Sequence, residues 1–199
     1  MNKHPLYVYV LGVAVVFVGG FFVLNSYIYN EKQPAGAADY KNAEYVIEGE
    51  RVKLQDGFSE TQAAPGSAAK VVTRYFGNEV RHDLDGDGRE DVAFLITQET
   101  GGSGVFFYLV AALNTPDGYI GSQAFFLGDR VAPQTTEIDE GETSKGTKRQ
   151  NVIVVNYAVR LPGEPFTARP SLGKSIWLKL DPQTMHFGEV VQNFEGESR

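Results

Sequence analysis

The most specific chemistry in this 199-residue chain lies in four aspartates within nine positions: Asp83, Asp85, Asp87 and Asp91. They take positions 1, 3, 5 and 9 of a loop that has glycine, Gly88, at position 6. A hard cation such as Ca²⁺ takes about six to eight oxygen ligands, and a tight loop directs alternate side chains inward. Carboxylates packed this closely repel one another unless a cation neutralises them. We therefore predict one Ca²⁺, bound by the four carboxylates and the backbone carbonyl of Arg89 at position 7.

The aspartate loop resembles two known calcium motifs to different extents. Its similarity to an EF-hand is partial, because position 12 is Phe94 and not a bidentate glutamate, and because strand-like residues follow the loop. The loop is more similar to that of FG-GAP repeats, where an Asp-x-Asp-x-Asp-Gly-x-x-Asp run precedes a strand. The alternative interpretation is a solvated Asp-Gly turn that binds no ion.

No catalytic motif stands out beside this loop. His4, His82 and His186 lie in separate regions without metal-site or triad spacing, and we interpret His82 as a solvated neighbour of the loop. No nucleophile elbow, His-Glu-x-x-His or phosphate-binding loop occurs, so an enzyme is not predicted. Acid–base groups need only proximity in space, however. A hydrolytic site built from Asp129, Glu137 and His186 therefore stays open as an alternative.

The elements that must position the loop are strands. Residues 91–97 and 105–113 are long apolar runs rich in β-branched and aromatic residues, which is typical of central strands buried on both faces. Shorter apolar or alternating patterns predict strands at residues 44–48, 51–54, 70–76, 119–127, 152–158, 176–180 and 185–191. A short helix also fits residues 70–76. Because no long amphipathic helix occurs, we predict an all-β domain, mainly an antiparallel sandwich or a barrel-like fold.

A long apolar run precedes this domain. The 19 residues from Leu6 to Leu24 carry no charge and no proline, and at about 1.5 Å each they cover about 28 Å, close to the hydrocarbon thickness of a bilayer. Tyrosines flank the run at both ends, as in interfacial aromatic belts. A cleaved signal peptide is the rival interpretation, but the nearest small-residue cleavage pattern, residues 35–37, lies more than ten residues beyond the run. The run therefore predicts an N-terminal transmembrane helix that is retained.

The positive charge of Lys3 and the amino terminus places the N-terminus in the cytoplasm by the positive-inside bias. The predicted organisation is then a cytoplasmic N-terminus at 1–5, a transmembrane anchor at 6–28, a tether at 29–42 and an extracytoplasmic β domain at 43–199. The predicted location is the cell membrane, which the chain crosses once.

Charge and cysteine content narrow the classes of partner. All 25 acidic residues follow residue 30, whereas one of the 18 basic residues precedes it, so the rest of the chain carries a net charge of −8 from 17 basic and 25 acidic residues. This balance argues against nucleic acid and anionic lipid as partners, since both are held by clustered Lys and Arg. The chain has no cysteine, which excludes disulfides, thiolate metal sites and cysteine nucleophiles.

Beyond the loop, the order of the segments Asp-Val-Ala-Phe-Leu, Thr-Gly-Gly-Ser-Gly, Leu-Val-Ala-Ala-Leu-Asn, Leu-Gly-Asp-Arg and Asn-Val-Ile-Val-Val resembles a group of uncharacterised secreted or lipid-anchored bacterial β domains. The resemblance covers about Tyr45 to Leu180. It implies an envelope location and an all-β fold, and it carries over no catalytic residue. The chain departs from it between Leu161 and Gly173, where cysteines of some relatives are expected and none occurs.

Together these observations predict a single-pass, membrane-anchored extracytoplasmic β domain with one Ca²⁺ loop. Its expected role is a binding or structural module of the bacterial cell envelope, with a surface protein or glycan as partner. An envelope hydrolase is the alternative. A polar pocket lined by convergent titratable groups favours the hydrolase, and a flat or aromatic patch favours the binding module. The sequence leaves the oligomeric state open.

Overall fold

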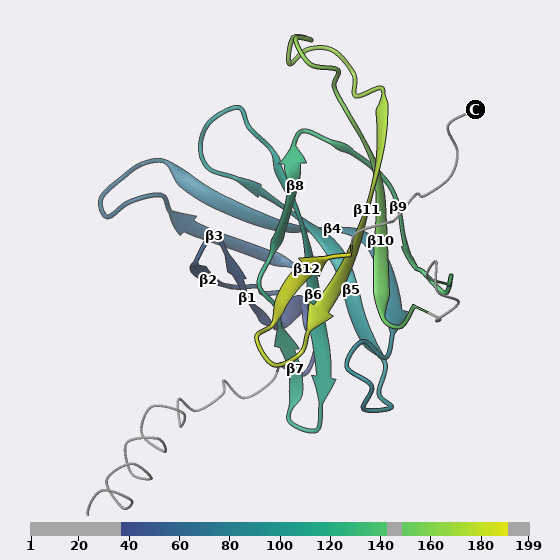
Figure 1. The fold of residues 1–199 in the computed structure, drawn as a ribbon. Helices are drawn as coiled ribbons and strands as arrows, with labels where there is room; N and C mark the ends of the chain where they lie inside the picture. Colours follow the sequence, from purple (N-terminus) through teal and green to yellow (C-terminus); the bar gives the residue numbers. More distant parts are fainter. Residues whose placement is uncertain (1–36, 143–148, 191–199) are drawn as a thin grey trace, which may run out of the picture. The chain divides into compact units, whose positions relative to one another are not determined.

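The computed structural model describes residues 37–142 and 149–190, and this part of the chain forms antiparallel sheets (Figure 1). The larger sheet has the strand order β3-β4-β5-β6-β7, and β8 pairs with the other half of β6. Its strands are β3 (Phe58–Gln62), β4 (Lys70–His82), β5 (Asp91–Glu99), β6 (Phe106–Thr115), β7 (Gly118–Gly121) and β8 (Phe125–Asp129).

A second sheet has the order β12-β11-β10-β9. Its strands are β9 (Ala132–Ile138), β10 (Val152–Val159), β11 (Leu172–Asp181) and β12 (His186–Glu189). The remaining secondary structure of the described residues is the short 3-10 helix η1 (Tyr40–Asn42) and a separate hairpin of β1 (Glu44–Ile47) and β2 (Glu50–Lys53). The predicted all-β, antiparallel fold class is confirmed.

The central strands β5 and β6 are buried on both faces, as their unbroken apolar sequences predict. Successive side chains of a strand point to opposite faces, and Ala93 and Leu95 of β5 accordingly enter one core while Phe94 and Ile96 enter the other. Strand β6 divides in the same way, with Leu109 in the first core. These two strands therefore form the middle of three layers.

The first core lies between the two sheets, where β5, β6 and β8 face Ile153 and Val155 of β10 and Leu178 of β11. Hydrogen bonds from one side chain and one backbone amide also join the two sheets. The side chain of Asn78 on β4 donates to the carbonyl of Gln134 on β9 (3.1 Å), and the amide of Gln123 donates to the carbonyl of Met185 beside β12 (2.8 Å). The fold is thus a sandwich with barrel-like contacts along its edges.

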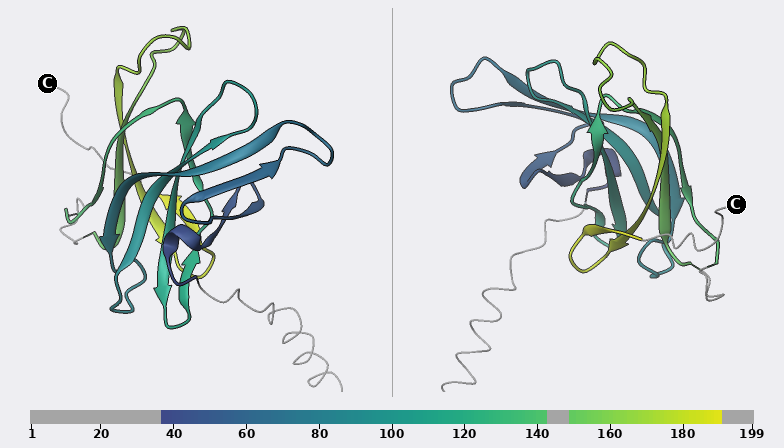
Figure 2. Two further views of the ribbon diagram at one scale, coloured as in Figure 1. Left: turned by 180° about the vertical axis from the view of Figure 1, so that it is seen from behind. Right: turned by 45° about the horizontal axis from the view of Figure 1, so that its top comes forward.

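The second core covers the outer face of the larger sheet. There η1 and the β1–β2 hairpin pack over β5 and β6, and they are visible from behind in Figure 2. Phe94 has no exposed surface and contacts the rings of Tyr40, Tyr45 and Tyr75 at centroid distances of 5.3, 5.6 and 5.4 Å. Edge-to-face and tilted aromatic contacts of this kind add to the area buried.

Several strand boundaries differ from those predicted. Residues 70–76 are strand and not helix, and β4 continues to His82. The single strand predicted at 119–127 is wrong, because the chain leaves β7 at Gly121 and resumes pairing only at β8. At this break the β1 backbone approaches so closely that a Cβ on Gly121 would lie 2.2 Å from the Glu44 carbonyl. Strands β3 and β9 have no counterpart among the predicted elements.

The anchor predicted at residues 6–28 lies outside the described residues, as do the cytoplasmic stretch and most of the tether. Among the residues that the structure describes, no helix has the length and apolar character needed to cross a membrane.

Candidate metal centre

The aspartate loop connects β4 to β5 and lies at the same end of the domain as the β6–β7 turn (Figure 1). Two glycines give it its shape, because Gly86 and Gly88 take φ values of 85° and 86°. Glycine adopts this left-handed region without the steric cost that a Cβ imposes. The backbone at Gly88, the sixth position, takes this left-handed conformation, and strand β5 follows the loop where an EF-hand would continue as a helix.

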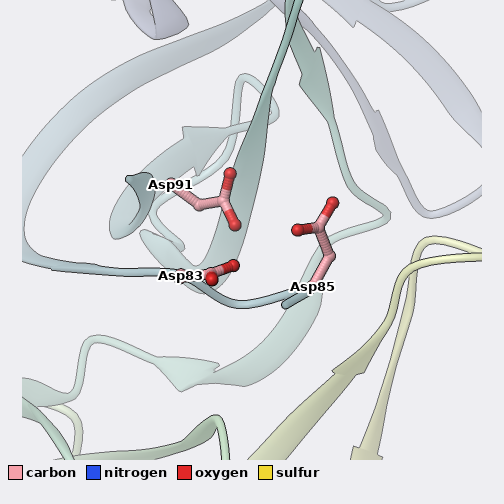
Figure 3. Close-up of side chains that lie close together, drawn as sticks. All are labelled: Asp83, Asp85 and Asp91. Carbon is pink, nitrogen blue, oxygen red and sulfur yellow. The ribbon is translucent and has the colours of Figure 1, made fainter. Parts of the chain in front are cut away.

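Three of the four predicted carboxylates converge. One carboxylate oxygen from each of Asp83, Asp85 and Asp91 lies within 4.8 Å of the others, and Figure 3 shows the three side chains turned toward one common space. Asp83 and Asp85 are partly exposed, whereas Asp91 is fully buried. All the side-chain ligand atoms gathered here are carboxylate oxygens, which hard cations prefer.

Asp91 ties the centre to the core of the domain. Its Oδ2 accepts a hydrogen bond from the amide of Leu84 (2.8 Å), and its Oδ1 accepts one from the amide of Asn114 at the end of β6 (2.7 Å). Burial raises the pKa of Asp91, the two amides act against this, and the charges of Asp85 and Asp87 add to the rise. A cation between the carboxylates would relieve that repulsion.

Asp83 organises the loop backbone from its first position. Its carboxylate accepts hydrogen bonds from the amides of Gly86 (2.7 Å), Asp87 (3.1 Å) and Gly88 (2.9 Å). These bonds, with that from Gly88 the strongest influence, lower the pKa of Asp83. The side chain is therefore held ionised at neutral pH, in the state that ligates metals.

Asp87, the fourth predicted ligand, lies outside the cluster of three. Its Oδ2 forms an ion pair with Nη2 of Arg89, and its Oδ1 accepts a hydrogen bond from the amide of Arg89 (2.8 Å). Arg89 also donates from Nε to the carbonyl of Asn114. The side chain of Arg89 thus links the loop to β6, while its backbone carbonyl stays a predicted ligand.

Two asparagines form hydrogen bonds to the loop from parts of the chain that are distant in sequence. Sequence reasoning did not identify either of them. The backbone amide of Asn114 donates a hydrogen bond to Asp91, and the side chain of Asn114 donates one to the carbonyl of Glu90 (3.3 Å). Asn151, next to β10, donates to the carbonyl of Leu84 (3.0 Å). Both contacts join residues more than 20 positions apart, so no local spacing could have indicated them.

The structure places the three residues considered for a hydrolytic site on different strands. Asp129 forms an ion pair with its neighbour Arg130 (2.7 Å) and accepts a hydrogen bond from the amide of Val105 (2.9 Å). Glu137 lies on β9 opposite Val154, and His186 on β12 contacts the side chain of Gln123 (2.5 Å). His82 ends β4 immediately before the loop. Among the described residues, the aspartate cluster is the group of acidic or histidine side chains whose ligand atoms converge.

Comparison of the chain with protein-family models, with curated proteins and with solved structures finds no match. The site therefore rests on its own geometry. The described residues form an antiparallel β sandwich that carries a cluster of carboxylate oxygens where β4 meets β5. Such a cluster could hold a divalent cation, and a bound cation would then fix the start of strand β5.

Proposed function

We propose that this chain is a single-pass, membrane-anchored β domain on the extracytoplasmic side of a bacterial cell membrane. In this proposal it binds one Ca²⁺ and serves the cell envelope as a binding or structural module, with a surface protein or glycan as partner. The observation that carries the calcium part is the convergence of Asp83, Asp85 and Asp91 within 4.8 Å. The uncharged run from Leu6 to Leu24 and the position of Lys3 support the anchor and its orientation.

The oxygen donors present fit calcium better than a transition metal. No cysteine or histidine belongs to the cluster, and carboxylate and carbonyl oxygens suit Ca²⁺ and Mg²⁺, whereas imidazole and thiolate suit zinc or copper. Three carboxylates, the carbonyl of Arg89 and solvent would complete a shell of about six to eight oxygens. Asp87 would join them after releasing Arg89, whose ion pair with it is partly exposed to solvent and therefore weak.

Calcium in this position would act on the fold more than on a reaction. The ion would tie the loop to Asp91, the first residue of β5, and through the amide of Asn114 to the end of β6. Metal bound only by the native state stabilises that state by mass action. The expected role of the ion is therefore to fix the register of the two central strands.

The separate partners of Asp129 and His186 favour a binding or structural module over a hydrolase. A general base and its acid must lie within reach of one substrate. Asp129 is engaged with Arg130, and His186 is engaged with Gln123. The hydrolase accordingly stays the second candidate.

Thermal unfolding of the full chain in detergent tests the calcium proposal. Extracellular calcium modules bind with Kd of about 10⁻⁴ to 10⁻³ M, so that about 2 mM Ca²⁺ adds roughly 0.6 to 1.8 kcal/mol of stability. This predicts a Tm about 2 to 6 °C higher in calcium than in chelator. Asp85→Ala should abolish the difference, because it removes one carboxylate of the cluster. It should still fold, because the Asp85 carboxylate accepts only the amide of Asp87 from the loop backbone (3.1 Å). Equal melting of both proteins with and without calcium would show that the loop is only a turn.

A further inference from the structure

A solvent-open pocket of about 360 Å³ lies beside His82, the last residue of β4 before the aspartate loop. It is formed by the end of β4, the residues after β9 and the residues before β10. Its polar lining consists of His82, Asp139, Glu140, Arg149, Gln150 and Asn151. Pockets that hold small molecules have volumes of about 300 to 1,000 Å³, so this one has room for a small ligand.

The two strongest charges in the pocket already neutralise each other. Asp139 and Arg149 form an ion pair, and their side chains are only 14% and 19% exposed. Asp139 also accepts a hydrogen bond from the amide of Gly141 (2.8 Å) and interacts with the side chain of Trp177. Burial acts to raise the pKa of Asp139, but these hydrogen bonds and the charge of Arg149 outweigh it and lower the pKa. A charged ligand would have to compete with this pair, and breaking a largely buried ion pair is costly.

The remaining hydrogen-bonding groups are mixed in kind. A guanidinium has five N–H donors, so Arg149 keeps donors beyond the one given to Asp139. Gln150 is exposed and offers both a donor and an acceptor, and Glu140 is an exposed acceptor. The amide nitrogen of Asn151 is used by the carbonyl of Leu84, which leaves its oxygen as an acceptor. A ligand rich in hydroxyl groups, each of which donates and accepts, matches such a lining.

We propose that this pocket binds a neutral sugar unit, held by Arg149, Gln150 and Glu140 around the fixed Asp139–Arg149 pair. The proposal rests on the proposed role as an envelope binding module and names the ligand class of that module. The sugar and the ion would occupy separate sites, because no residue of the aspartate cluster lines the pocket. The affinity should be low, since the described residues of the lining carry no phenyl, phenol or indole ring on which a sugar could stack.

Trp177 provides a direct readout, because it is the one tryptophan of the chain and it interacts with Asp139 in the pocket wall. The full chain is titrated in a detergent without a sugar headgroup. The probes are glucose, galactose, mannose, N-acetylglucosamine and N-acetylgalactosamine, with glucuronate and glucosamine as charged counterparts. A hexose of about 12 non-hydrogen atoms at ordinary ligand efficiency has a Kd of about 1 mM. At least one neutral sugar should give a saturable change in Trp177 fluorescence near that concentration, and the charged counterparts should bind less tightly.

Three variants connect the binding to the pocket. Arg149→Lys keeps the positive charge but loses the planar guanidinium group and its fixed set of N–H donors. It should weaken sugar binding about tenfold. Gln150→Ala alters an exposed side chain, so it should fold normally and weaken binding several-fold, which guards against misfolding of the first variant. Arg74→Lys is the matched control, because Arg74 forms an exposed ion pair with Glu99 outside the pocket. It should leave binding unchanged.

The proposal is overturned if none of the five neutral sugars saturates the signal up to about 50 mM, far above the expected Kd. It is also overturned if sugar binds equally well to wild type, Arg149→Lys and Gln150→Ala. The titration is run in calcium and in chelator. Sugar binding without any calcium response would remove the calcium assignment alone, whereas a calcium response without sugar binding would remove this inference alone.

Discussion

Replacing Asp91 should destabilise the domain even when no metal is present. Asp91 is fully buried, and its two oxygens accept the amides of Leu84 and Asn114 at 2.8 and 2.7 Å. Asp91→Ala leaves the buried N–H of Leu84 and the partly buried N–H of Asn114 without an acceptor, at about 1 to 3 kcal/mol each, or at most roughly 2 to 6 kcal/mol in all. Asp91→Asn keeps one carboxamide oxygen and should cost about 1 to 3 kcal/mol. Burial and, to a smaller extent, the charges of Asp85 and Asp87 raise the pKa of Asp91. Removing its charge therefore offsets part of either loss.

The assay is thermal or urea unfolding of the full chain in chelator, followed by Trp177 fluorescence. Asp85→Asn is the matched control, since Asp85 is only partly buried and accepts one loop amide, that of Asp87. It should lose less than about 1 kcal/mol. Asp91→Ala as stable as wild type to within about 0.5 kcal/mol would refute the reasoning, as would equal losses at Asp85 and Asp91.

Two further predictions concern pH and topology. The pKa of Asp139 is lower in the folded chain than its ordinary value, so its ion pair with Arg149 stabilises the fold fully above the unfolded pKa of about 3.9. That stabilisation fades as the pH falls through the folded pKa. Asp139→Asn should therefore lose about 1 to 3 kcal/mol at pH 7, and its difference from wild type should shrink in unfolding measured from pH 5 down to pH 3. A constant difference would contradict the ionic cause. For topology, protease added outside the membrane should digest the chain after Asn30, and protection equal to that of a cytoplasmic marker would reverse the orientation. A mature chain that begins near Ala38 would show a cleaved anchor.

The central part of the fold could be predicted from the sequence because its strands are buried on both faces. β5 contains five consecutive apolar residues (92–96) and β6 contains eight (106–113), and such runs are recognisable without knowing their partners. The strands at the margins give weaker signals. Residues 58–62 of β3 read Phe-Ser-Glu-Thr-Gln and are largely exposed, and β9 contains Pro133 and several polar residues. Their strand structure comes from pairing with β4 and β10, which no local pattern encodes.

The geometry of the candidate metal centre could be predicted only in part, for a similar reason. Spacing along the chain identified the loop and its glycine turn, because these depend on neighbouring residues. The spacing could not show that the Asp87 carboxylate pairs with the guanidinium of Arg89. This ion pair holds Asp87 away from the other three carboxylates. The contributions of Asn114 and Asn151 depend on β6 and β10 lying beside the loop. The break between β7 and β8 likewise follows from the close approach of β1 to Gly121.

Calorimetric titration of the full chain with CaCl₂ tests the central claim, which is that the aspartate loop binds one Ca²⁺. One ion per chain should bind with a Kd of about 10⁻⁴ to 10⁻³ M, and Asp85→Ala should fold as wild type does in chelator yet give no binding heat. Absence of binding heat from the wild-type chain up to several times the upper Kd, or identical heats from Asp85→Ala, would contradict the calcium centre at Asp83, Asp85 and Asp91.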